Sequence, residues 1–226
     1  DMKKVKKIIS VVLVLGMFSG TAFSATQIEW WHAMGGALGE AVNTIVGGFN
    51  RSQTEYEMKA VYKGNYTETM TAAIAAFRAK KQPHVVQVFE VGTATMMAAK
   101  GAIYPVHQMM KDSGQPFDES RYISAVIGYY TTTDGKLLSL PFNSSTPVVF
   151  WNKAAFAKAG LPSPPKTWEE MGKFSRKLIS SGASECGFTI GWQSWSMLEN
   201  FSTWHDVPFA TKENGFAGLD TEFVFD

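Results

Sequence analysis

The sequence is poor in the residues and motifs on which most catalytic and metal sites depend. It contains one cysteine, Cys186, in 226 residues, which excludes an internal disulfide. The HExxH, GxSxG and Walker A patterns are missing, and no Cys/His cluster occurs. The four histidines are scattered without the spacing of metal ligands. These absences argue against a metal-dependent or nucleophilic enzyme, and we expect no catalytic residues, no metal and no cofactor.

An excess of charge of either sign is also lacking. The formal net charge is +1, and the chain becomes slightly acidic once its lysine-rich first residues are set aside. A nucleic-acid partner is therefore not expected, because such proteins carry a basic surface. With 45% hydrophobic and 18% charged residues, the composition is that of an ordinary globular protein rather than a disordered one.

Long apolar runs are restricted to the N-terminus. Ile8 to Phe18 falls short of the ~20 residues that a membrane-spanning helix needs. Four lysines precede this run, and Ala22-Phe23-Ser24 places small residues at positions −3 and −1 before Ala25. This three-part pattern predicts that residues 1–24 form a signal peptide, cleaved near Ser24-Ala25, and that the mature chain is exported. No cysteine follows the cleavage site, so a lipoprotein anchor is not expected.

The first part of the mature chain alternates between strand and helix patterns. Residues 27–31 predict a buried strand, followed by a glycine-containing loop and a helix that runs to residue 49. Residues 56–62 predict a second strand, 66–80 an amphipathic helix and 84–89 a third strand. Strands and helices at this spacing predict βαβ units in a three-layer α/β lobe.

The remaining sequence predicts shorter elements. Thr167-Trp168-Glu169-Glu170 is typical of a capping box, in which Thr167 and Glu170 satisfy each other's amides. We predict helices at 93–100, 106–113 and 118–130, strands at 137–140 and 148–151, and helical structure from Lys153 onward.

The last residues, Leu219 to Asp226, alternate like a strand and then stop. One interpretation is a natural C-terminal strand. Because a chain normally ends in a polar or docked segment, we favour the other interpretation, in which the natural chain continues beyond Asp226.

Aromatic and small polar residues follow several of the predicted strands. In an open α/β sheet, ligands bind outside the carboxyl ends of the strands. Indole rings present a flat apolar face to the carbon skeleton of a polyol or sugar, while hydroxyls and a carboxylate bind its OH groups. The candidate binding residues are Tyr66, Glu90, Ser144, Ser145, Trp192 and Trp195.

Each candidate also has a purely structural interpretation. Trp192 and Trp195 lie three residues apart and fit core positions as well as a binding surface. Glu90 is placed to cap the helix that follows it, and Ser144-Ser145 fits an ordinary turn. Tyr66 fits an exposed surface position. Spacing alone therefore leaves both roles open at every position.

Several longer segments carry a resemblance to one family. They are Trp31 to Met34, Tyr62 to Tyr66, Ala75 to Arg78, Gln87 to Met97, Pro141 to Pro147, Gly191 to Trp195, Leu198 to Ser202 and Pro208 to Ala210. These segments resemble the family 1 extracellular solute-binding proteins of ABC importers, in the branch whose ligand is glycerol-3-phosphate, and the likeness covers essentially the whole mature chain. The Asn152-Lys153 turn and the stretch 164–170 are shared more widely, with maltose-binding relatives.

The resemblance implies an α/β fold of the two-lobe, type II periplasmic binding protein kind. Its lobes are three-layer α/β/α structures joined by hinge strands, with the ligand in the cleft between them. Residues 25–145 would form the first lobe and residues 146–226 the start of the second, which would be incomplete in this chain. The resemblance further implies a monomer in the periplasm that delivers its ligand to an ABC permease in the inner membrane.

The resemblance also implies a ligand class and a set of contacts. The ligands would be glycerol-3-phosphate and glycerophosphodiesters such as glycerophosphocholine, bound without catalysis. Tyr66, Glu90 and Ser145 (in preference to Ser144) would contact the ligand, and Trp192 and Trp195 would form an aromatic wall. The family also uses residues of its C-terminal half, including an arginine for the phosphate, and nothing in this sequence matches them.

Two alternative functions remain. The first is a binding protein of the same fold for maltose or another oligosaccharide, which would use the same aromatic platforms. The second is an exported hydrolase of glycerophosphodiesters with Glu90 as a general base.

Overall fold

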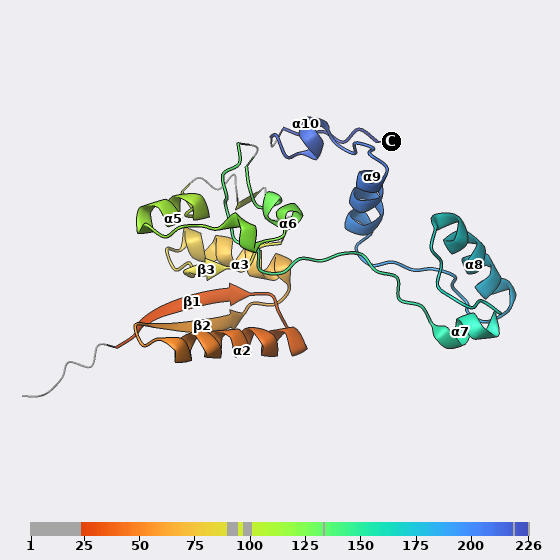
Figure 1. The fold of residues 1–226 in the computed structure, drawn as a ribbon, viewed down its shortest axis with the longest axis horizontal. Coiled ribbons are helices and arrows are strands. Elements are labelled where there is room, and N and C mark those ends of the chain that lie inside the picture. Colours follow the sequence, from red (N-terminus) through yellow and green to blue (C-terminus); the bar gives the residue numbers. More distant parts are fainter. Residues whose placement is uncertain (1–23, 90–94, 97–100, 133, 219, 226) are drawn as a thin grey trace, which may run out of the picture. The chain divides into compact units, whose positions relative to one another are not determined.

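The computed structural model describes residues 24–89, 95–96, 101–132, 134–218 and 220–225 (Figure 1). The chain divides into two compact units, one up to Ile103 and one from Tyr104 onward. We call them unit 1 and unit 2. The lobe boundary predicted between Ser145 and Thr146 stays a prediction.

Unit 1 is built on a three-stranded parallel sheet of order β2-β1-β3. β1 (Thr26–His32) and β2 (Tyr56–Tyr62) pair over their whole length. β3 (Val85–Val86) pairs with β1 at only two positions. The strands predicted at 27–31 and 56–62 are confirmed, whereas the strand predicted at 84–89 is shorter than expected. One reason is that the His84 side chain, through Nδ1, accepts the hydrogen bond of the Glu29 amide (3.0 Å).

Two helices of the described residues pack on this sheet. α2 (Gly36–Ser52) connects β1 to β2, and α3 (Tyr66–Arg78) leads from β2 toward β3. Because β2 and β3 lie on opposite sides of β1, right-handed connections place these helices on opposite faces of the sheet, as Figure 1 shows. The predicted α/β/α layering is therefore confirmed in unit 1.

The core of unit 1 lies between α2 and the sheet. Trp30 of β1 packs with Met34 and with Val42 and Val46 of α2, all 8% exposed or less. Trp31 is equally buried, and it points to the other face because side chains alternate along a strand.

A capping box begins α3. The Asn65 side chain accepts a hydrogen bond from the Glu68 amide (2.9 Å), and the Glu68 carboxylate accepts one from the Asn65 amide (2.7 Å). Gly64 has a φ of +91°, and a Cβ there would lie 2.1 Å from Glu68 Oε2. Glycine therefore allows the carboxylate to fold back onto the helix start.

Unit 2 consists of short helices around two small apolar cores. One core contains Val106, Ile127 and Leu137, and the other contains residues of α7 and α8 with Leu161. No helix within the described ranges combines the length and apolar character that crossing a bilayer requires. The helices are α5 (Val106–Ser113), η1 (Glu119–Arg121), α6 (Ser124–Gly128), α7 (Lys153–Lys158), α8 (Trp168–Ser180), η2 (Ser194–Glu199), α9 (Asn200–Trp204) and α10 (Thr211–Asn214).

Several elements of unit 2 differ from the predictions. Leu137 forms only an isolated bridge with Thr131, and residues 148–151 have no ladder partner among the described residues. The helix predicted at 118–130 is broken into η1 and α6, because Tyr122 and Ile123 are extended. The helix predicted at 93–100 lies largely outside the described residues.

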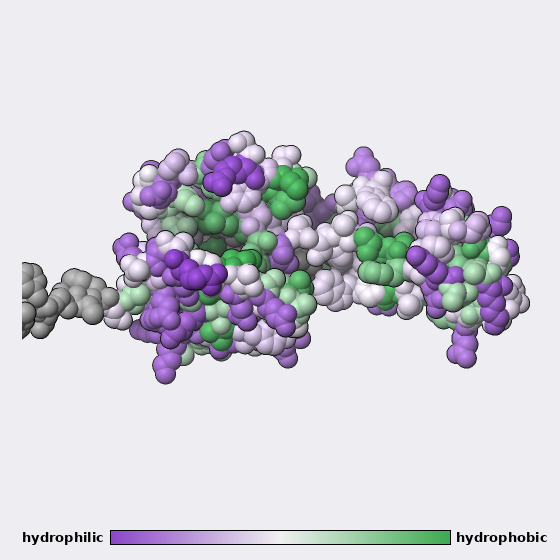
Figure 2. All heavy atoms as spheres, turned by 60° about the horizontal axis from the view of Figure 1, so that its bottom comes forward, coloured by the Kyte–Doolittle hydropathy of each residue, from purple (hydrophilic) through white to green (hydrophobic). Residues whose placement is uncertain are grey.

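Two predicted features of unit 2, the capping box at Thr167 and the strand-like C-terminal stretch, differ from the prediction in their hydrogen bonds. Thr167 caps α8 by accepting from the Glu170 amide (3.2 Å), but the Glu170 carboxylate accepts from Lys166 (2.7 Å) instead of Thr167. The strand-like stretch near the C-terminus pairs through a single bridge between Phe223 and Ala210. Hydrophobic side chains also reach the surface in several places (Figure 2).

Candidate ligand-binding site

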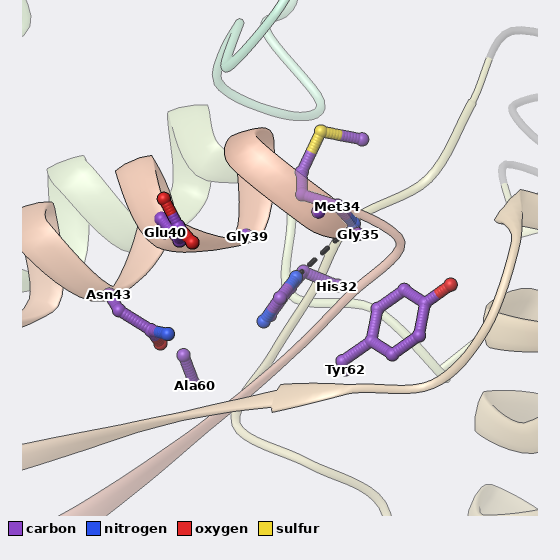
Figure 3. A pocket seen from close by; sticks show the side chains of 9 residues that line it. His32, Met34, Gly35, Gly39, Glu40, Asn43, Ala60 and Tyr62 are labelled. Atoms are coloured by element: carbon purple, nitrogen blue, oxygen red, sulfur yellow. Dashed lines mark hydrogen bonds between the residues drawn. The ribbon is translucent and has the colours of Figure 1, made fainter.

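The carboxyl ends of β1 and β2 border a cavity of about 350 Å³ in unit 1 (Figure 3). His32 ends β1 and Tyr62 ends β2, and the two residues are partners in the parallel register. The N-terminal turns of α2 cover the same face of the sheet. Small residues on both elements, Gly36 of α2 and Ala60 of β2 among them, leave the space unfilled. The cavity thus lies at the edge of the sheet where α/β proteins bind ligands.

His32 is the most deeply buried polar residue of this cavity, with 3% of its surface exposed. Its Nδ1 accepts a hydrogen bond from the Met34 amide (3.2 Å). Burial lowers the pKa of His32, so the ring is neutral at pH 7. A neutral imidazole that accepts at Nδ1 carries its proton on Nε2. His32 therefore presents an N–H donor on its other side.

Glycine allows α2 to begin close to the end of β1. A Cβ at Gly39 would lie 2.8 Å from the Met34 carbonyl oxygen. The helix starts after Gly35, which has no side chain with which to cap it, and both residues line the cavity. The first backbone amides of α2 are therefore free of side-chain caps at the rim.

Tyr66 lies at the same edge of unit 1, as the first residue of α3. It packs against the Trp30 core and stacks on Phe89, with ring centroids 5.3 Å apart and an interplanar angle of 9°. Its predicted position at a helix start after the second strand is confirmed. Its contact with a ligand stays a prediction.

Trp192 and Trp195 come together in unit 2. Their rings meet edge to face, with centroids 6.1 Å apart. Trp192 is 61% exposed and Trp195 is half-buried, and their contact with a ligand stays a prediction. Trp192 also has a φ of +52°, and the π-helical turn η2 begins two residues later. Strained residues and π-helical turns are frequent at functional sites.

The structure gives less information on the other residues predicted to contact a ligand. Ser144 and Ser145 are both exposed in an irregular segment, which leaves the turn and the ligand interpretations of Ser145 open. Glu90 lies outside the described residues. Tyr66 belongs to unit 1, whereas Ser145 and the two tryptophans belong to unit 2. Their assembly into one site stays a prediction.

Unit 2 has a cavity of its own, of about 520 Å³, beside α7. Trp151, Leu161 and Pro162 give it a largely apolar lining, and among the described lining residues Lys153 is the charged one. In the part of the chain that the structure describes, no three Cys, His, Asp or Glu side chains gather in a way that would hold a metal ion.

Sequence reasoning did not select the polar residues of the unit 1 cavity. In the sequence, His32 is an isolated histidine, and Glu40 and Asn43 are ordinary polar positions of a predicted helix. The available signal was the position of His32 at the end of a predicted strand, directly before the Gly35-Gly36 loop. Ligand-binding residues of α/β proteins concentrate at such positions.

Comparison with known proteins identifies the family. Residues 17–226 match the model of the bacterial extracellular solute-binding proteins. The sn-glycerol-3-phosphate-binding periplasmic protein UgpB of Brucella abortus (strain 2308) is 47% identical over 215 residues, which are 94% of this chain and 49% of that protein. UgpB of Yersinia pestis bv. Antiqua (strain Antiqua) is 51% identical over 221 residues, 96% of this chain and 50% of that protein. The chain spans about half the length of the curated relatives it matches.

A solved structure supports the fold alone. CpMnBP1 with mannotriose bound superposes with a TM-score of 0.52 at 24% sequence identity, covering 68% of this chain and 38% of that chain. The family match covers nearly all of the chain, and it confirms the resemblance that the sequence motifs indicated. This chain belongs to the bacterial extracellular solute-binding proteins.

Proposed function

We propose that this chain is part of the solute-binding component of an ABC importer for glycerol-3-phosphate and glycerophosphodiesters. The observation that carries the proposal is 47–51% identity, over 94–96% of the chain, to proteins named for binding sn-glycerol-3-phosphate in the periplasm. The protein works in the periplasm after removal of residues 1–24, as a monomer. It delivers its ligand to a permease in the inner membrane.

The proposed site combines polar contacts with an aromatic wall. Trp192 and Trp195 lie against the glycerol carbons, and the exposure and strained backbone of Trp192 support this role. Tyr66 and Ser145 bind ligand oxygens. Glu90 binds glycerol hydroxyls, since a carboxylate next to the anionic phosphate would be unfavourable.

The proposed mechanism is capture without chemical change. The first lobe, residues 25–145, and a second lobe that begins at residue 146 close around the ligand and dock on the permease in the closed form. Ligand favours closure because only the closed form contacts it from both lobes.

A tryptophan-fluorescence titration of the full-length protein tests the proposal. We expect a saturable change with glycerol-3-phosphate and none with maltose. A response to maltose alone would leave the fold standing and overturn the ligand. Release of choline from glycerophosphocholine by the purified protein would instead reveal a hydrolase.

A further inference from the structure

We propose that the cavity at the carboxyl ends of β1 and β2 is a subsite for an uncharged polyhydroxyl group, namely the second alcohol of a glycerophosphodiester. The inference rests on the proposed function and deepens it. It adds a preference among diesters and three residues, His32, Glu40 and Asn43, to the predicted contacts.

The position of the cavity suits a headgroup. It occupies the same sheet edge as Tyr66, and Met34, which lines it, belongs to the core cluster against which Tyr66 packs. We place the glycerol-3-phosphate part of the diester at Tyr66 and its second alcohol in this cavity, at the same edge of the sheet. The cavity volume of about 350 Å³ is many times the ~30 Å³ that one water molecule occupies. A three-carbon polyol therefore fits in it.

The polar groups around the cavity include both hydrogen-bond donors and hydrogen-bond acceptors. His32 offers its Nε2–H, which has no hydrogen-bond partner among the described residues. Glu40 is an acceptor, and Asn43, one helical turn further along α2, both donates and accepts. In Figure 3 the second ring nitrogen of His32 and the Asn43 amide face one another across the space. Hydroxyl groups, which also donate and accept, match this set.

The charges argue for a neutral group. No lysine or arginine is found among the described residues that line the cavity, and Glu40 is the charged side chain there. A phosphate would be attracted by the uncapped first turn of α2 but repelled by this carboxylate. A cationic headgroup would be attracted by Glu40 but would meet the Nε2–H donor of His32 and the positive end of the α2 dipole. An uncharged alcohol avoids both conflicts.

The ring of Tyr62 provides the apolar part of the subsite. A Cβ at Gly35 would lie 3.3 Å from the Tyr62 hydroxyl, so glycine keeps this side of the cavity open. Figure 3 shows the Tyr62 hydroxyl directed away from Asn43, which leaves the ring beside the cavity. Polyol carbons pack well on such a ring.

The test is calorimetric titration of the full-length protein with glycerol-3-phosphate, glycerophosphoglycerol and glycerophosphocholine. The variants are Glu40→Ala and Asn43→Ala, which remove exposed side chains of α2, and Thr44→Ala is the matched control outside the cavity. We expect each cavity variant to weaken the binding of glycerophosphoglycerol about fivefold or more, as for loss of one to two hydrogen bonds. The affinity for glycerol-3-phosphate should change less than about twofold, and Thr44→Ala should change neither affinity.

Equal losses for glycerol-3-phosphate and glycerophosphoglycerol, or no loss for either, would overturn the subsite and leave the proposed function intact. A loss confined to glycerophosphocholine would overturn the neutral headgroup. If the unmodified protein binds none of the three ligands, the proposed function fails and the inference fails with it.

Discussion

In unit 1, β1 is hydrogen-bonded to a strand on each side, whereas in unit 2 the apolar stretch Val148 to Phe150 has no ladder partner among the described residues. Trp30 and Trp31 are each 8% exposed, while Phe150 is 94% exposed. Both segments are rich in strand-forming residues. The comparison teaches that such residues form a strand only where a neighbouring strand completes the ladder.

The cores of the two units differ in the same way. The core of unit 1 joins β1 to a helix packed across the sheet. One core of unit 2 joins α7 to α8 through Phe156 and Leu178, and no strand contributes to it. Helices find their hydrogen-bond partners within themselves, so they form around a small core without any sheet.

The largest expected effect comes from breaking the core of unit 1. Trp30→Ala removes a buried indole between β1 and α2, and we expect the free energy of unfolding of the full-length protein to fall by about 3–5 kcal/mol. Urea denaturation measures it. The control is Trp204→Ala in unit 2, where the side chain is 67% exposed and the change should stay within about 0.5 kcal/mol. Similar losses in both variants would contradict the contrast between the units.

A second prediction concerns the close contact that lets α2 begin beside β1. In Gly39→Ala, the new Cβ meets the Met34 carbonyl oxygen, and we expect a loss of about 1–3 kcal/mol of unfolding free energy. Gly48→Ala, in the same helix, meets nothing within 4 Å and should stabilise the protein by roughly 0.5–1 kcal/mol. Thermal or urea unfolding of both variants checks the sign. Two stabilised variants would show that α2 moves away from Met34 without cost.

The smallest expected effect comes from substituting the proposed ligand contacts, one in each unit. Trp192→Ala should weaken glycerol-3-phosphate binding at least tenfold, ~1.4 kcal/mol, and leave stability nearly unchanged, because the side chain is exposed. Tyr66→Ala should lower both affinity and stability, because Tyr66 packs against the Trp30 core. Titration calorimetry and urea unfolding separate the two quantities. Unchanged affinity in Trp192→Ala would remove the aromatic wall from the site.

Local elements were predictable where their cause lies within a few residues. The start of α3 depends on reciprocal bonds between Asn65 and Glu68, and the start of α7 on Asn152, which caps the Ala155 amide. The length of β3 was not predictable, because the His84 side chain takes a backbone donor of β1, 55 residues away. The single helix predicted at 118–130 was wrong for a local reason, since the 3-10 turn that Asp118 caps ends at the extended Tyr122.

The sequence by itself determined the family, the strand–helix order of unit 1 and the position of Tyr66 at a helix start. Only the tertiary structure decided that Trp192 is exposed and that His32 borders a cavity with Glu40 and Asn43. The physical reason is that burial and orientation depend on partners far along the chain. The parallel register of β1 and β2 places His32 opposite Tyr62, 30 residues later, and no local pattern encodes that pairing.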